Sequence, residues 1–298
     1  MEKSEKLGLT GLLVLSMCIW GASWSSAKVL SGYASASTIT FIRFIIIPLV
    51  LFPFLKAKGI PLGLKREGWM FVLGAGALMA VYTLLFFSGL QRGLPGAGGV
   101  LVTTSIPIFA SILGLLINRR IPRLREQIGL VMGLFAGGLL LQIGERLEGI
   151  FSGGNLYFLF GALVYAGMSK ITALAPRFGH PIAFNAWLHS VALVGLAFTT
   201  DFDEVGTLFS QADPKFWGNV IYFGVVNSSF ATTTYFFATA KLGAERASTF
   251  MFIVPSAAVF FSWLILGEAL LISTALGGII AVIAVLMING QLAFFQRK

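Results

Sequence analysis

The sequence predicts an all-α integral membrane protein with ten transmembrane helices. Hydrophobic residues make up 57% of the 298 positions, charged residues only 11%, and the mean hydropathy is +0.88. A soluble domain has about 25% charged residues, so this chain could not cover the surface of a soluble fold. Ten apolar stretches give the number of helices, and a one-sided distribution of basic residues gives their orientation.

A membrane-spanning helix needs about 20 mostly apolar residues. The joints between such stretches are short and carry helix breakers such as Gly59, Pro61 and Pro122. The first stretch continues past Lys28 without a cleavage-site pattern, so we expect a span rather than a cleaved signal. The longest polar stretch, 200–215, is expected to be an acidic loop. The ten expected spans are 8–30, 38–55, 68–90, 95–117, 127–143, 155–175, 182–199, 216–240, 247–266 and 270–290.

The basic residues outside the spans fall almost entirely on one side. If the N-terminus is cytoplasmic, the cytoplasmic segments hold fifteen Lys and Arg residues, and the opposite side holds only Arg92, Arg146 and Lys215. Such a bias orients membrane proteins with the basic side inside. We therefore expect a multi-pass protein of the plasma (inner) membrane with cytoplasmic N- and C-termini. The net charge of +9 then reflects topology and does not indicate nucleic-acid binding.

The two halves of the chain resemble each other. A shift of 148 residues brings Pro107 onto Pro255 and Gly76 onto Gly224. The expected domains are 1–144 and 145–298, each with five spans, within one membrane domain. Because five is odd, the second copy enters the membrane from the other side, which makes an inverted repeat typical of secondary transporters.

Several other functions are disfavoured by the residues available. One cysteine, Cys18, and two histidines exclude a disulfide framework and a Cys-based metal site. No phosphate-binding glycine loop is present. We expect no catalytic residue, metal or cofactor, and the partners to be a small-molecule solute and the lipid bilayer. A membrane-embedded enzyme stays a remote alternative, and the oligomeric state is open.

Ionisable residues inside a bilayer are costly and are functional candidates. Three basic residues fall within spans, Lys28, Arg43 and Lys170, whereas no Asp or Glu lies in the middle of one. This asymmetry favours a solute with a carboxylate or phosphate over an organic cation.

Aromatic and amide side chains at depth are the other candidates, because a polar group facing lipid is unfavourable. In the eighth span, α-helical spacing predicts a stripe at 227, 231 and 234 that faces a central cavity. For each candidate, packing against another helix remains the alternative. The substrate-binding candidates are Trp20, Trp24, Arg43, Tyr82, Tyr165, Lys170, Asn227 and Tyr235.

The order of short motifs resembles that of a known family. Trp20-Gly21, then Phe41 to Phe44, and later Ile253-Val254-Pro255 followed by Leu266-Gly267-Glu268, are similar to the ten-span EamA-type permeases of the drug/metabolite transporter superfamily. The chain departs from many relatives at Asn118-Arg119-Arg120, where they carry Gly or an acid.

That resemblance implies a secondary transporter that works by alternating access between the two repeats. Relatives include exporters of amino acids, aromatic ones among them. We therefore expect export of small amphipathic metabolites such as amino acids. The alternative within transport is a drug or organic-cation exporter.

Overall fold

The computed structural model describes residues 3–92, 95–119, 121–140, 153–266 and 272–288. Within these ranges every regular element is a helix, which confirms the predicted fold class. The first half consists of α1 (Lys3–Leu30), α2 (Ala36–Ala57), α3 (Gly68–Arg92), α4 (Pro95–Asn118) and α5 (Leu124–Leu140).

The second half is divided into more elements than the first. Its eighth span joins three segments, and its ninth begins with two short ones. The elements are α6 (Gly153–Thr172), η2 (Ala175–Arg177), α7 (Pro181–Ala197), α8 (Phe202–Gln211), α9 (Pro214–Ile221), η3 (Tyr222–Thr232), α10 (Thr233–Leu242), α11 (Ala244–Thr249), η4 (Phe250–Phe252), α12 (Ile253–Leu266) and α13 (Ile272–Ile288).

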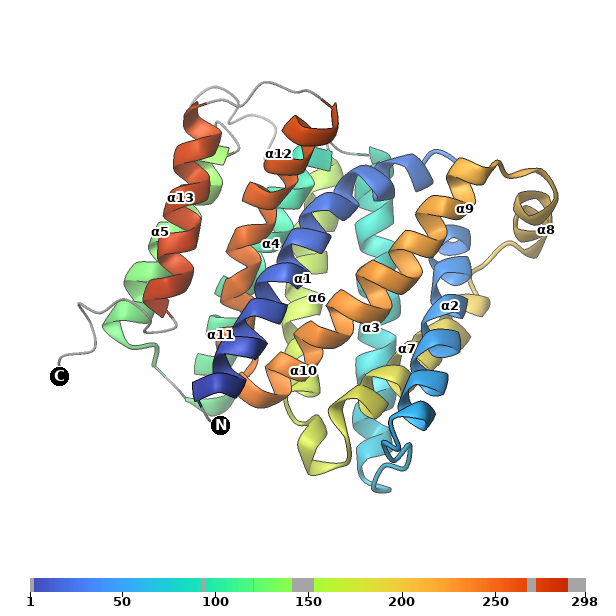
Figure 1. The fold of residues 1–298 in the computed structure, drawn as a ribbon, viewed down its shortest axis with the longest axis horizontal. Helices are drawn as coiled ribbons and strands as arrows, with labels where there is room; N and C mark the ends of the chain where they lie inside the picture. The colour runs from blue at the N-terminus through green and yellow to red at the C-terminus, as the bar shows by residue number, and fades with distance from the viewer. Residues whose placement is uncertain (1–2, 93–94, 120, 141–152, 267–271, 289–298) are drawn as a thin grey trace.

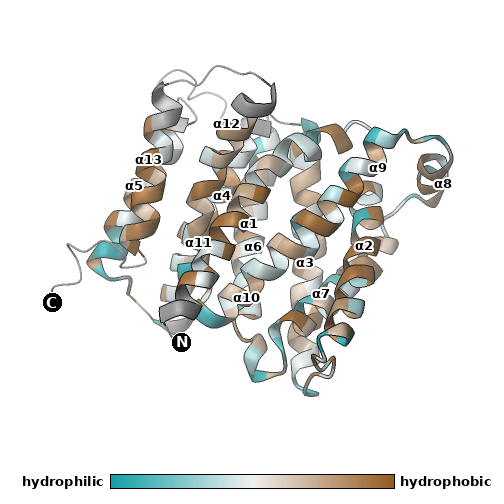
Figure 2. Ribbon diagram, in the orientation of Figure 1, coloured by the Kyte–Doolittle hydropathy of each residue, from teal (hydrophilic) through white to brown (hydrophobic). Residues whose placement is uncertain are grey.

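Five helices of the described chain are individually long and apolar enough to cross a membrane, and they lie in the first, second, third, fourth and sixth spans. α5 and α13, with 17 residues each, reach only the lower limit of about 17 for a span. Large apolar residues such as Leu116, Ile117 and Phe135 are exposed, and Figure 2 shows hydrophobic residues in brown along the helices. Such side chains would contact lipid.

Corresponding helices of the two halves run in opposite directions. In Figure 1, α3 rises from the lower edge to the upper edge, whereas α9 and α10 descend; likewise α4 descends and α12 rises. α1 begins and α13 ends on the same, lower side. This arrangement is the inverted repeat that two five-span halves predict.

The contacts between helices repeat in the pattern that a twofold axis produces. α1 packs on α12 and on η3, and the repeat-related helix α6 packs on the corresponding elements α4 and α3. In the same way, the contact of α3 with α7 corresponds to the contact of η3 with α2. Two repeat-related glycines lie at the last two crossings. A Cβ on Gly76 would come within 2.6 Å of Val191, and a Cβ on Gly224 within 2.9 Å of Ile46. The absence of a side chain lets both crossings close tightly.

The polar stretch after the seventh span is a helix rather than the expected loop. α8 is bent by 106° from α7, and its N-terminus is capped by Asp201, whose carboxylate accepts from two backbone N–H groups. This Asp cap, followed by apolar residues at helical spacing, is a helix start signal that the acidic composition obscured. The 144/145 domain boundary, Arg146, Glu268, Arg297 and Lys298 lie outside the described residues.

Candidate functional site

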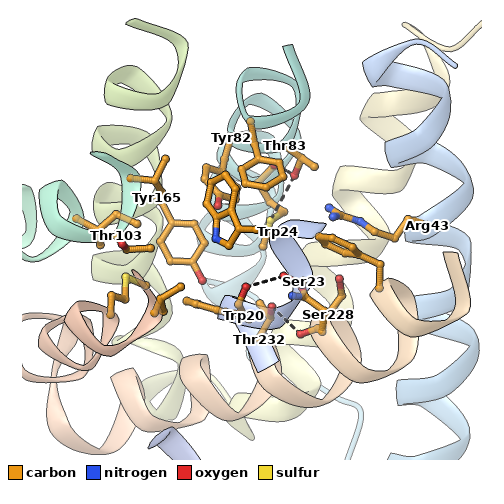
Figure 3. A pocket seen from close by; sticks show the side chains of 18 of the residues that line it. Trp20, Ser23, Trp24, Arg43, Tyr82, Thr83, Thr103, Tyr165, Ser228 and Thr232 are labelled. Carbon is orange, nitrogen blue, oxygen red and sulfur yellow. Dashed lines mark hydrogen bonds between the residues drawn. The ribbon is translucent and has the colours of Figure 1, made fainter. Parts of the chain in front are cut away.

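A cavity lies between the two halves, where α1, α3, α6 and η3 meet (Figure 3). Its empty volume is about 670 Å³, including the space at its open side. Small-molecule sites are typically lined mostly by apolar side chains with a few polar groups. The lining consists of Trp20, Ser23, Trp24, Arg43, Phe44, Met79, Tyr82, Thr83, Phe86, Val102, Thr103, Ile106, Tyr165, His189, Phe223, Asn227, Ser228, Thr232, Met251 and Val254.

Aromatic rings form the middle of this lining. The ring centroids of Trp20 and Tyr165 are 6.0 Å apart at 87°, and those of Tyr82 and Tyr165 are 4.7 Å apart at 62°. Trp24 continues the cluster through Phe86, at 5.0 Å. The first two pairs are edge-to-face, which is a favourable geometry for aromatic rings. They give the cavity a rigid wall suited to a flat apolar group.

Arg43 of α2 supplies the positive charge of the cavity. Its side chain is 5% exposed, and its guanidinium carbon lies 4.6 to 5.4 Å from the ring centroids of Phe44, Phe87 and Phe223. Its Nε has no hydrogen-bond partner among the described residues. None of the described residues that line the cavity is acidic. A buried cation without a carboxylate partner is costly, so Arg43 presents an unsatisfied group to an incoming anion.

Tyr165 presents a second buried polar atom of the lining without a partner among the described residues. Its side chain is 3% exposed, and its hydroxyl has no hydrogen-bond partner within the described chain. Figure 3 shows Arg43 at one side of the cavity and Tyr165 at the other, with Trp24 between them. A ligand that reaches both would place its polar groups at its ends and its apolar part between.

The π-helical segment η3 decides which residues of the eighth span face the cavity. Hydroxyls bond five residues back, from Ser229 to the carbonyl of Gly224 and from Thr232 to that of Asn227, as the wider turn requires. The residues on the cavity are 223, 227, 228 and 232, spaced by four and five. The α-helical spacing used for the sequence gave 227, 231 and 234 instead, because it assumed 3.6 residues per turn.

His189 of α7 was not among the residues chosen from the sequence. It is 1% exposed, it lines the cavity, and its ring centroid is 5.4 Å from that of Phe44. Its Nδ1 lies 2.9 Å from the carbonyl oxygen of Asn185, which can only accept, so Nδ1 carries the proton. The shift that relates the two halves places His189 close to the repeat equivalent of Arg43, and this relation could have marked it as a candidate.

Six of the eight candidates line the cavity, and two do not. Lys170 of α6 instead forms an ion pair with Glu245 of α11. Tyr235 is fully buried beside Trp20, with ring centroids 5.3 Å apart, and its hydroxyl is 3.2 Å from that of Ser169. Lys28, at the end of α1, is exposed.

No group of three His, Cys, Asp or Glu side chains in the described part of the chain could hold a metal ion. The lining of the cavity offers aromatic contact, hydrogen bonds and the positive charge of Arg43. These features suit reversible binding of a solute.

The profile of the EamA-like transporter family matches residues 9–142 and again 152–290. The chain belongs to this family. Its two matched segments are consistent with the duplicated architecture, and the family is one of transporters rather than enzymes. The protein is thus a multi-pass membrane transporter of small molecules.

Relatives match over nearly the whole chain. The uncharacterized transporter YoaV of Bacillus subtilis is 27% identical, over 97% of this chain and 98% of its own. An uncharacterized transporter of Archaeoglobus fulgidus is 22% identical, over 94% and 96%. A crystal structure with 17% identity superposes with a TM-score of 0.74 over 96% of this chain and 98% of that one, which shows the shared fold.

Proposed function

We propose that this transporter exports small amphipathic metabolites that carry a carboxylate, such as amino acids with large apolar side chains, by alternating access. The observation that carries the proposal is Arg43, a buried guanidinium without a carboxylate partner among the described residues. A guanidinium suits bidentate binding of a carboxylate. Trp20, Trp24 and Tyr82 would then cover the apolar part of the solute.

Alternating access is supported by the inverted repeat. Because helices of one half contact the other half in exchanged pairs, the two halves can swap their arrangements and open the cavity to either side in turn. The side on which α1 begins and α13 ends carries the basic segments. We take this side as cytoplasmic and the membrane as the plasma (inner) membrane, in line with the positive-inside rule.

An organic-cation exporter fits the cavity less well. A buried cation needs a carboxylate or comparable partner, and the described lining contains none while already holding the charge of Arg43. The drug-exporter alternative therefore places two positive charges in one cavity whose described lining holds no acidic residue.

Counterflow in proteoliposomes tests the proposal. Vesicles loaded with unlabelled phenylalanine or phenylpropanoate should accumulate the same labelled solute, whereas labelled tetraphenylphosphonium should not accumulate under matched loading. Empty vesicles, and vesicles with an unrelated membrane protein, serve as controls. Counterflow of the cation alone would contradict the carboxylate assignment and favour the drug-exporter alternative.

The orientation is tested separately by thiol labelling. With Cys18→Ser as background, Gln211→Cys should react with an impermeant reagent added to intact cells, whereas Lys58→Cys should require a permeant one. Both positions are exposed. The reverse pattern would place the basic side outside and overturn the proposed topology.

A further inference from the structure

Several charged side chains of the described chain have a polar or charged partner, whereas Arg43 has no carboxylate partner. Lys170 is neutralised by Glu245. Glu204 accepts hydrogen bonds from the backbone N–H and hydroxyl of Ser35, and Asp213 accepts from the hydroxyl of Tyr33. All of these groups lie outside the cavity lining. Arg43 lines the cavity with no carboxylate partner among the described residues.

We propose that the cavity selects solutes with one net negative charge, so that an aromatic monocarboxylate is preferred to the zwitterionic amino acid of the same shape. This inference rests on the proposed function and sharpens its substrate class. A monocarboxylate balances the charge of Arg43 and adds no further charge. An amino acid adds an ammonium group, which returns the occupied cavity to a net charge of +1.

That ammonium would find only neutral acceptors in the described lining. The hydroxyls of Ser23, Thr83 and Thr103 already donate to carbonyls of their own helices, at 2.8, 2.7 and 2.7 Å. Their oxygens keep lone pairs but carry no charge with which to balance a cation. A site lacking a partner for one polar group of a ligand discriminates against that ligand.

The aromatic rings nearest Arg43 do not supply a partner for the ammonium group. Phe44, Phe87 and Phe223 already face its guanidinium. The ammonium of an amino acid is two bonds from its carboxylate carbon, so it would lie in the repulsive field of the same arginine. The expected order of affinity is therefore monoanion, then zwitterion, then cation.

Three matched probes test this order: 3-phenylpropanoate, phenylalanine and 2-phenylethylamine. They share one ring and differ chiefly in charge. Each is used at pH 7.5 as an inhibitor of counterflow of labelled 3-phenylpropanoate and of labelled phenylalanine. Phenylpropanoate should inhibit at a concentration at least about ten-fold lower than phenylalanine, and phenylethylamine should be weakest.

The outcomes separate this inference from the proposed function. Equal or stronger inhibition by phenylalanine would overturn the charge preference while leaving carboxylate transport intact. Inhibition by phenylethylamine alone, or by none of the three, would overturn both.

A substitution that adds a carboxylate gives a second test. Asn227→Asp is close to isosteric, and position 227 lines the cavity. It should change the ratio of the two inhibitory concentrations by about ten-fold or more in favour of phenylalanine, because the ammonium gains a partner. Asn219→Asp on α9, outside the lining, is the matched control and should leave the ratio unchanged. An unchanged ratio in folded Asn227→Asp protein would contradict the proposal.

Discussion

Arg43 and Lys170 are both basic residues within spans, but of the two only Lys170 has an acidic partner in the described chain. Arg43 lines the cavity between the halves and is surrounded by aromatic rings. It has no carboxylate partner among the described residues. Lys170 lies outside the cavity lining and is paired with Glu245 across α6 and α11. A charge is unfavourable within a membrane. The charge of Lys170 is balanced by Glu245 of the same chain, and we propose that the charge of Arg43 is balanced by the solute.

The largest expected effect is on Arg43. Arg43→Gln should lower counterflow of phenylpropanoate about ten- to hundredfold, because it removes a charge-assisted interaction of about 1.5–3 kcal/mol. Thermal stability should stay the same or rise, since no partner is left unpaired. Arg92→Gln, at the exposed end of α3, is the control. Normal transport by Arg43→Gln would remove the contrast between the two residues.

Lys170 should behave in the opposite way. Lys170→Met leaves Glu245 without its partner, and the two side chains are only 12% and 19% exposed. We expect a loss of about 1–3 kcal/mol of stability, between the values for an exposed and a fully buried pair, measured as a lower unfolding temperature in detergent. The double variant Lys170→Met with Glu245→Gln should recover most of it. A transport defect in Lys170→Met without a change in stability would instead support the direct substrate role expected from the sequence.

Gly114 of α4 tests the ion pair without removing a charge. A Cβ at this position would lie 2.5 Å from Oε1 of Glu245 and 3.0 Å from Nζ of Lys170, so the pair must move. Gly167→Ala, where a Cβ meets nothing within 4 Å, is the control. We expect Gly114→Ala to be less stable than Gly167→Ala by about 1 kcal/mol. Equal stability would show that the pair adjusts without cost.

The smallest effect concerns the carboxylates that bind hydroxyls outside the spans. Burial tends to raise the pKa of Glu204, but hydrogen bonds from Ser35 and Thr38 outweigh it and lower this pKa; at Asp213, bonds from the Phe216 N–H and the Tyr33 hydroxyl lower the pKa. Their stabilisation is complete above the unfolded pKa values of about 4 and is lost as pH falls through the lowered native ones.

Hydrogen exchange of α8 measures this loss. After correction for the intrinsic pH dependence of exchange, protection of the α8 amides should decline below about pH 4. Ser35→Ala should weaken that dependence, because Glu204 then loses the hydroxyl donor. Unchanged protection down to pH 2 would show that these contacts do not hold α8.

The sequence predicted what the membrane itself dictates. Helices follow from the need to satisfy backbone hydrogen bonds in lipid. The inverted repeat was predicted from the similarity of the two halves and the odd number of spans expected in each, and Arg43 and Trp20 became candidates because polar groups are costly in lipid. The interaction partners of the charged side chains could not be predicted from the sequence. Glu245 lies 75 residues from Lys170, and nothing local marks the two as a pair. The π-helical turn of η3 was also missed, because spacing rules assume one helix type.

The unpartnered charge of Arg43 has an electrical consequence. If the occupied cavity carries a monoanion that balances the arginine and the empty cavity returns with its positive charge, each cycle moves one net charge across the bilayer. One elementary charge is worth about 2.3 kcal/mol per 100 mV. In a cell with a negative interior, the membrane potential would then drive the anion outward without any coupling ion.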